Sequence, residues 1–271
     1  MTIPVPNGHQ LRTVHDIVNG LRVHARVSAR HEGLPIVFVH GLGMSVRYME
    51  PTMLRLAARH HVEALDLPGF GKSDDPDHAF TLRELADALG AWLDVRGITR
   101  CVLVGNSYGC QVIVDFARRA PHRVAAIVLN APTMDPAHRT VFQQVGRVLL
   151  DIPREPWSLA PVVLLAYLRA GPLRLLATLR HALADRIEEK LPDIVAPVLV
   201  VTGARDPVVT VAWACEAARL VGISCGGAGG TVHVAPLAAH ALPFDDPVTF
   251  GALIEGFLSR VLPKASEGDI S

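Results

Sequence analysis

Residues 101–117, Cys-Val-Leu-Val-Gly-Asn-Ser-Tyr-Gly-Cys-Gln-Val-Ile-Val-Asp-Phe-Ala, place a Gly-x-Ser-x-Gly pentapeptide between two different patterns. The apolar run at 101–104 is typical of a buried strand, and the spacing from 111 to 120 is typical of a helix. Ser107 then lies at the turn between them, where the flanking glycines let strand and helix approach closely. Such a turn holds its serine above the edge of a sheet, as a serine nucleophile requires.

The rest of the chain alternates between strand and helix patterns. Strands are expected at 13–18, 21–28, 34–39, 61–67, 100–104, 124–130, 196–202 and 231–235, and helices at 47–58, 81–95, 111–120, 211–220 and 248–261. Asn19-Gly20, between the first two strands, suits a two-residue hairpin turn. The alternation predicts an α/β fold with a mostly parallel, doubly wound sheet covered by helices on both faces.

The alternation stops between Ala131 and Leu191, where leucine-rich helical segments are interrupted by prolines. We expect a helical cap, or lid, at residues 133–191, inserted after the strand that ends near Asn130. The remaining residues, 1–132 and 192–271, would form the core. The insertion follows the carboxyl end of a strand, so it would cover the edge where open α/β sheets bind ligands.

The apolar run from Val162 to Leu168 has two interpretations. It packs the lid onto the core, or it lines a pocket for a lipophilic substrate. The surrounding stretch 156–168 contains Pro161 and is followed by Arg169, and it is too short to cross a bilayer. We therefore expect no membrane span.

Composition narrows the class of partner. The chain has 271 residues, half of them apolar, and its 26 Lys and Arg balance 26 Asp and Glu. This balance gives no global field that would favour nucleic acid, an anionic membrane or a polyanionic substrate. We expect a small-molecule substrate and no nucleic acid. The four cysteines lack metal-ligand or disulfide-framework spacing, and residues 1–9 lack the pattern of an export signal, so a reducing cytoplasm is expected.

A second glycine-containing loop follows the strand at 34–39. His40-Gly41-Leu42-Gly43 can bend so that a backbone N–H faces a reacting carbonyl. We expect the amides of Leu42 and Tyr108 to form an oxyanion hole, the second because it follows the nucleophile at a helix start. His40 itself is expected to shape the loop.

Two histidines compete for the role of general base. His240 lies in the loop 238–243, between the last strand and the last helix, which places it at the same sheet edge as Ser107. His233 lies seven residues earlier, inside the strand at 231–235, where strand geometry would fix its direction. We favour His240 and keep His233 as the alternative.

The acid that orients the base has two candidates as well. Asp206 follows the strand at 196–202, again at a carboxyl end, and could accept the imidazole N–H. Asp135 follows the preceding strand and is the alternative. The favoured order, Ser107, Asp206 and His240, is associated with one fold.

These motifs resemble the successive signatures of the α/β-hydrolase fold superfamily. The resemblance rests on His40-Gly41-Leu42-Gly43, Asp66-Leu67-Pro68-Gly69-Phe70-Gly71-Lys72-Ser73, Gly105-Asn106-Ser107-Tyr108-Gly109, Gly203-Ala204-Arg205-Asp206 and the His240 loop. It implies a capped serine hydrolase that needs no cofactor and no metal. Serine at position 107 argues against the dehalogenase and epoxide hydrolase branches, which use aspartate there.

The resemblance leaves the reaction open. We expect cleavage of an ester or related acyl bond of a small, lipophilic substrate through an acyl-enzyme. The alternative is carbon–carbon hydrolysis or a lyase-type reaction on the same residues, for which Arg174 and Arg180 are candidate lid arginines, although Ala241 stands where a tryptophan is usual. A third possibility is a ligand-binding protein with little turnover.

One further motif ends like a phosphate-binding P-loop. Gly69-Phe70-Gly71-Lys72-Ser73 has the terminal Gly-Lys-Ser, but Asp66 occupies the position of the required first glycine. We therefore expect no nucleotide site there.

Overall fold

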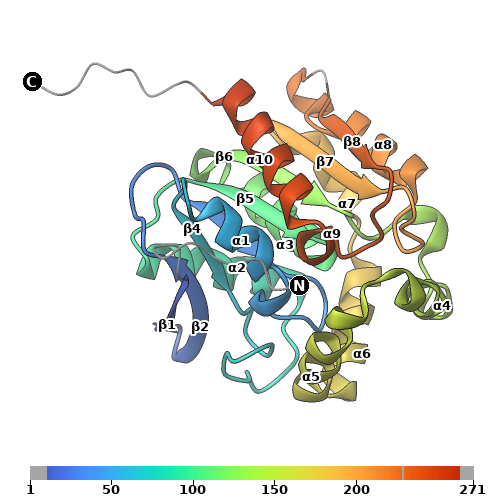
Figure 1. Ribbon diagram of the computed structural model, residues 1–271, viewed down its shortest axis with the longest axis horizontal. Coiled ribbons are helices and arrows are strands. Elements are labelled where there is room, and N and C mark those ends of the chain that lie inside the picture. The colour runs from blue at the N-terminus through green and yellow to red at the C-terminus, as the bar shows by residue number, and fades with distance from the viewer. Residues whose placement is uncertain (1–10, 228, 263–271) are drawn as a thin grey trace, which may run out of the picture.

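An eight-stranded sheet runs through the computed structural model, which describes residues 11–227 and 229–262. In chain order the strands are β1 (Leu11–Val18), β2 (Leu21–Ser28), β3 (Ile36–Val39), β4 (Val62–Leu65), β5 (Cys101–Asn106), β6 (Val124–Asn130), β7 (Val198–Gly203) and β8 (Thr231–Ala235). Their order across the sheet is β1-β2-β4-β3-β5-β6-β7-β8 (Figure 1). The pairs β1–β2 and β2–β4 are antiparallel and the others parallel, which confirms the mostly parallel sheet. The residues considered for an export signal, 1–9, lie outside the described part.

The hairpin forms as the Asn-Gly pair predicts. Asn19 and Gly20 have φ of 50° and 83°, the two positive values that a type I′ turn requires. β1 and β2 then pair in register from Leu11 opposite Ser28 to Val18 opposite Leu21.

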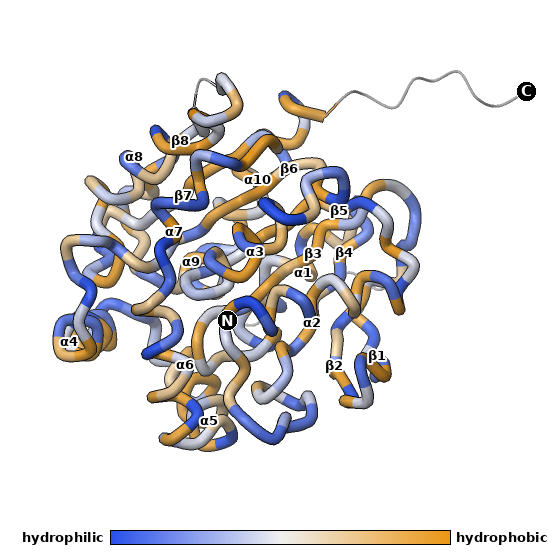
Figure 2. Tube along the Cα trace, turned by 180° about the vertical axis from the view of Figure 1, so that it is seen from behind, coloured by the Kyte–Doolittle hydropathy of each residue, from blue (hydrophilic) through white to orange (hydrophobic). Residues whose placement is uncertain are grey.

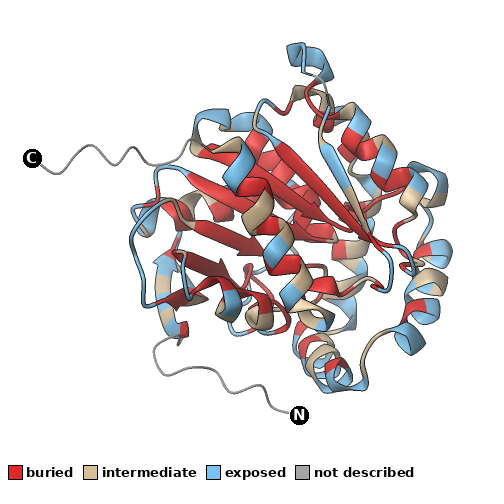
Figure 3. Cartoon of the chain, turned by 45° about the horizontal axis from the view of Figure 1, so that its top comes forward, coloured by how far each residue is buried: buried red, intermediate tan, exposed pale blue. Residues whose placement is uncertain are grey.

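Helices cover both faces of the sheet. The core helices are α1 (Glu50–Leu56), α2 (Leu82–Val95), α3 (Tyr108–Arg119), α8 (Val211–Leu220), α9 (Leu242–Asp245) and α10 (Pro247–Val261). Buried side chains of α2, α3 and α8 pack on one face, and those of α1, α9 and α10 on the other. Successive strand residues alternate between these two clusters, Val37 and Val39 joining the first and Ile36 and Phe38 the second. Inner strands such as β3 and β5 are therefore buried on both sides (Figure 3), and the doubly wound architecture is confirmed.

Two predicted boundaries differ in ways that matter for the site. The helix expected at 47–58 is divided into a 3-10 turn, Val46–Tyr48, and α1, with Pro51 in the first turn of α1. β5 continues to Asn106 and α3 begins at Tyr108, three positions before the predicted start. Only Ser107 separates strand from helix, so the reversal is tighter than its sequence pattern indicated.

The insertion after β6 is helical. It contains α4 (Val141–Asp151), α5 (Ala160–Ala170), α6 (Pro172–Ala184) and α7 (Ile187–Lys190). α4, α5 and α6 gather on one side of the molecule (Figures 1 and 2). No single helix of the described residues is long and apolar enough to cross a bilayer; the bent pair Trp157–Ala170 and Pro172–Ala184, which meets at 95°, passes such a test jointly by length and composition.

Candidate active site

Ser107 occupies a strained turn between β5 and α3. Its φ of 55° and ψ of −122° lie outside the regions that non-glycine residues favour. The glycines beside it permit this geometry, because a Cβ on Gly109 would lie 2.3 Å from the carbonyl oxygen of Val39, and one on Gly105 would lie 2.8 Å from Ile113. The serine is thereby held at the start of a helix and at the carboxyl end of the sheet.

His240 and Asp206 form a hydrogen-bonded pair. His240 Nδ1 lies 2.9 Å from Asp206 Oδ2, and because a carboxylate accepts, Nδ1 donates. Asp206 Oδ1 accepts from the backbone amides of Val208 and Val209 at 2.7 and 3.0 Å. These bonds fix the buried carboxylate and leave His240 Nε2 as the ring nitrogen available for a substrate-side proton.

The alternative base and acid are not brought together. His233 lies within β8 and pairs with Val201 of β7. Asp135 accepts from the Thr210 hydroxyl at 3.1 Å and from the Ala137 amide at 2.9 Å. The structure thus places the favoured acid against the favoured histidine.

The His240 loop is attached to the turn that holds Ser107. The Asn106 side-chain amide donates to the His240 carbonyl at 3.3 Å. Farther back, the Arg205 amide donates to the Ala238 carbonyl at 3.0 Å, which holds the loop against the end of β7. Among the described residues no hydrogen bond joins the Ser107 hydroxyl to His240, so the Asn106 amide is the polar link between the two segments.

The loop after β3 lies directly against the turn that holds Ser107. Met44 N–H donates to Gly41 O at 3.1 Å, and Gly43, with φ of 72°, closes this turn. A Cβ on Gly41 would lie only 3.2 Å from Ser107 Cβ. Within residues 11–227 and 229–262, the amides of Leu42 and Tyr108 donate to no other residue, which leaves both available to an oxyanion.

Both ring nitrogens of His40 have hydrogen-bond partners on the backbone. Its Nδ1 lies 2.8 Å from the Gly41 carbonyl, and its Nε2 accepts from the Leu67 amide at 3.0 Å. Burial lowers the pKa of His40, so the ring is held neutral. Both ring nitrogens are therefore engaged by backbone groups, which agrees with the expected role of His40 in shaping the loop.

Two lid carboxylates lie beside His240, and sequence reasoning missed them. Glu155 Oε1 accepts from the Ala241 amide at 2.7 Å, while Glu155 Oε2 and Asp151 Oδ1 are buried without a partner among the described residues. Burial and the neighbouring Asp151 raise the pKa of Glu155 to about 7. A signal existed, because Asp151 and Glu155 are the only acidic residues between Asp135 and Asp185.

These carboxylates affect the candidate base. Burial disfavours the charged form of His240, but Asp206, followed by Asp151 and Glu155, outweighs it and raises the pKa of His240 to about 9. The neighbouring carboxylates therefore favour the imidazolium over the neutral ring.

Lid side chains cover the loop after β3, which contains Leu42 and Gly43. A Cβ on Gly43 would lie 2.5 Å from Leu175 of α6 and 2.9 Å from Tyr167 of α5. Some lid apolar residues therefore pack against the core loop. Of the two candidate lid arginines, Arg174 is 3.3 Å from Asp75 and Arg180 is exposed.

The Gly69–Ser73 loop surrounds a carboxylate. Asp66 accepts from the amides of Lys72 and Val46 at 2.8 and 2.7 Å, and a Cβ on Gly71 would lie 2.2 Å from it. A negatively charged side chain thus occupies the position that a phosphate would need.

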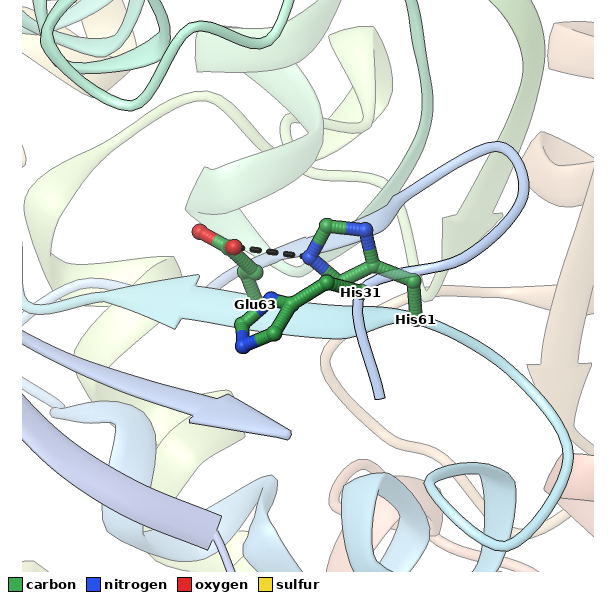
Figure 4. A group of neighbouring side chains, drawn as sticks. All are labelled: His31, His61 and Glu63. Atoms are coloured by element: carbon green, nitrogen blue, oxygen red, sulfur yellow. Dashed lines mark hydrogen bonds and ion pairs between the residues drawn. The ribbon is translucent and has the colours of Figure 1, made fainter. Parts of the chain in front are cut away.

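One group has the residue types of a metal site. His31, His61 and Glu63 bring ligand atoms within 4.8 Å of one another, and His61 Nε2 is 2.8 Å from Glu63 Oε1 (Figure 4). Arg96 donates to both Glu63 oxygens at 3.0 Å, and Arg12 lies 2.7 Å from His31 Nε2. Two guanidinium groups would oppose a bound cation, so this set does not fit a metal.

Comparison with known proteins identifies the family. The model of the alpha/beta hydrolase family matches residues 36–253, and the chain belongs to this family. It is 37% identical over 112 residues to the Caenorhabditis elegans abhydrolase domain-containing protein abhd-5.2, a match that spans 38% of this chain and only 25% of that relative.

Solved structures share the fold over most of the chain. A membrane phospholipase A described as a bacterial virulence factor superposes with a TM-score of 0.81 at 22% identity, covering 93% of this chain and 87% of that one. Est816, described as an N-acyl homoserine lactone degrading enzyme, has a TM-score of 0.75 at 25% identity, with coverage of 90% and 100%.

Proposed function

We propose that the protein is a serine hydrolase that cleaves an ester or related acyl bond of a small, lipophilic substrate. Ser107 is the nucleophile, His240 the general base and Asp206 the residue that orients it. The observation that carries this proposal is the 2.9 Å hydrogen bond between His240 and Asp206. The His240 loop is in turn hydrogen-bonded to Asn106, the residue before Ser107. Est816, which shares the fold, is described as an N-acyl homoserine lactone degrading enzyme.

The geometry supports a two-step acyl transfer. Ser107 attacks the carbonyl carbon while neutral His240 accepts the hydroxyl proton at Nε2. Asp206 holds Nδ1–H and stabilises the imidazolium that forms. The amides of Leu42 and Tyr108 donate to the oxyanion, His240 returns its proton to the leaving group, and water then releases the acyl group by the same route.

The side chains gathered near Ser107 favour a lipophilic acyl group. Leu175 and Tyr167 of the lid pack against Gly43 in the loop after β3. Tyr108, the first residue of α3, directly follows Ser107. Burial raises the pKa of Tyr108, whose hydroxyl has no partner among the described residues. Apolar and aromatic surroundings of this kind suit an acyl chain better than a charged substrate.

Hydrolysis of p-nitrophenyl esters of increasing acyl length tests the proposal. Ser107→Ala is expected to lower kcat by about 10³-fold or more. Ser158→Ala, an exposed lid serine, is the matched control and should retain activity. Wild-type-like turnover by Ser107→Ala would refute the assignment, and cleavage of dienone substrates but not esters would favour the carbon–carbon alternative.

We also propose a cytoplasmic location. It is supported by the cysteines, all four of which are free, with Cys101 and Cys110 buried. Reduced thiols are the rule in that compartment.

A further inference from the structure

The lid carries large hydrophobic side chains on its outer surface. Of 19 large hydrophobic residues that are exposed in the described chain, 12 lie between positions 142 and 176. They are Phe142, Val145, Val148, Leu149, Leu150, Ile152, Trp157, Leu164, Leu165, Leu168, Leu173 and Leu176. We call these residues the lid surface. Hydrophobic stretches recur along α4, α5 and α6 in Figure 2, so the exposure is concentrated on one part of the molecule.

The spacing of these residues shows that they form outward stripes. Phe142, Val145 and Leu149 repeat along α4 at intervals of three and four, and Leu173 and Leu176 do so along α6. The inward positions of α5 and α6 are small: Ala166, Ala170, Thr178 and Ala182 are the buried ones. Leu175, Leu179 and Leu183 of α6 are partly buried against the core, whereas the 12 residues of the lid surface are exposed. Packing of the lid onto the core therefore does not explain these 12.

The exposed charge of residues 141–184, the stretch that carries the lid surface, is entirely positive. Between residues 141 and 184 the exposed charged residues are Arg154, Arg169 and Arg180. The two acidic residues of this stretch, Asp151 and Glu155, are buried and half-buried beside His240. A surface that combines apolar stripes with arginines and no exposed carboxylate complements an anionic lipid surface.

Positive charge continues from the lid onto the core. Arg169 of α5 lines a cavity of about 360 Å³ together with Arg47 and Lys72. None of these three forms an ion pair with another described residue. The two carboxylates of the same cavity do have partners, because Glu50 is paired with Arg26 at 2.9 Å and Asp66 is bonded to His24 at 2.8 Å. The cavity thus offers unpaired cations where an anionic headgroup would lie next to the lid surface.

We propose that the lid surface docks on the face of an anionic phospholipid bilayer. A second copy of the chain fits less well, because a two-fold contact would place this surface against itself and its arginines against arginines. The helices lie in the interface rather than crossing it, since α5 and α6 bury their small faces on the protein. Docking would bring the covered site to the place where lipophilic acyl compounds concentrate.

Vesicle binding tests this proposal independently of catalysis. The full chain and Ser107→Ala are sedimented with vesicles of phosphatidylcholine alone and of phosphatidylcholine mixed with phosphatidylglycerol. Both proteins should bind the anionic vesicles more tightly, and added salt should weaken binding. Leu173→Ser should lower the binding constant about tenfold. Ile17→Ser, which alters an exposed residue of β1, should leave it unchanged.

The charge component has its own matched pair. Arg180→Glu should weaken binding to the anionic vesicles and leave binding to phosphatidylcholine unaltered. Arg83→Glu, on an exposed and unpaired arginine of α2 in the described chain, should change neither. Equal loss in both variants would show a non-specific effect of net charge and overturn the proposal.

The chain contains an internal probe for docking. Trp157 is 87% exposed, whereas Trp92 and Trp213 are buried. Tryptophan emission should shift to shorter wavelength when anionic vesicles are added, and Trp157→Ser should abolish the shift. Absence of binding to both vesicle types, or a stable dimer that Leu173→Ser dissociates, would overturn the proposal and assign the lid surface to a protein contact.

Discussion

Asn106 and His240, 134 positions apart in the sequence, are joined by a side-chain hydrogen bond of 3.3 Å to the His240 main-chain carbonyl. The Asn106 side-chain oxygen Oδ1 accepts from the buried Tyr48 hydroxyl, and this hydroxyl in turn accepts from the Gly41 amide at 3.2 Å. One asparagine therefore connects the turn that holds Ser107, the loop that holds His240 and the loop after β3 that contains Gly41. Three loops that supply different parts of the candidate site share one buried polar network.

Replacement of Asn106 tests this network. Asn106→Leu leaves the buried Tyr48 hydroxyl without its acceptor, so unfolding free energy should fall by about 1–3 kcal/mol. Its neighbour in register, Asn130, has side-chain atoms without a partner in the described chain, so Asn130→Leu should cost less. Urea unfolding and esterase assays measure both. Equal destabilisation in the two variants would show that the Asn106 bonds contribute little.

Asp206 and Asp135 are distinguished by amide substitution. Asp206→Asn removes the carboxylate that orients His240 and should lower kcat by about 10²–10⁴-fold with little change in the fold. Asp135→Asn alters a side chain bonded to Thr210 and Ala137 and should retain most activity. Steady-state kinetics with a p-nitrophenyl ester compares them, and the reverse ranking would exchange the roles of the two acids.

The lid carboxylates predict an alkaline activity profile. His240 acts as a base only when neutral, and its pKa is raised to about 9, so kcat/KM should rise with pH up to that value and level off above it. Asp151→Asn removes one of the charges that raise this pKa and should move the midpoint to lower pH. Glu216→Gln, on a partly exposed carboxylate of α8 that pairs with Arg219, is the control. A midpoint near 6.5 in all three proteins would contradict this electrostatic account.

Two helical glycines should respond oppositely to alanine. At Gly109 the new Cβ would lie 2.3 Å from a β3 carbonyl oxygen, so Gly109→Ala should destabilise the fold by about 3 kcal/mol or prevent folding. At Gly146 of α4 nothing lies within 4 Å, so Gly146→Ala should stabilise by about 0.5–1 kcal/mol. Thermal unfolding monitored by circular dichroism compares them, and similar effects would show that close packing at the turn is not limiting.

Much of the fold could be predicted because its signals are local. Alternating apolar patterns specify strands and helices, and Asn19-Gly20 specifies its turn through backbone conformation alone. Ser107 is likewise recognised because a strained turn needs glycines on either side. The observed helix boundaries differ from the predicted ones where tertiary contacts determine them. At Tyr108, for example, the helix begins immediately after the turn.

The charge environment of the site could not be predicted in the same way. Asp151 and Glu155 act on His240 through space, and their effect depends on how the lid folds back over the sheet. Nor does a pattern show which side of a helix faces water, so the run at 162–168 suggested packing or a pocket. In the structure its leucines at 164, 165 and 168 are exposed.

Covalent labelling tests the central claim most directly. A fluorophosphonate should add one adduct per chain, located on the peptide that contains Ser107, and labelling should slow markedly in Asp206→Asn. Ser107→Ala should remain unlabelled while it stays folded. Adduct on another residue, or undiminished labelling of folded Ser107→Ala, would contradict the assignment of Ser107 as the nucleophile.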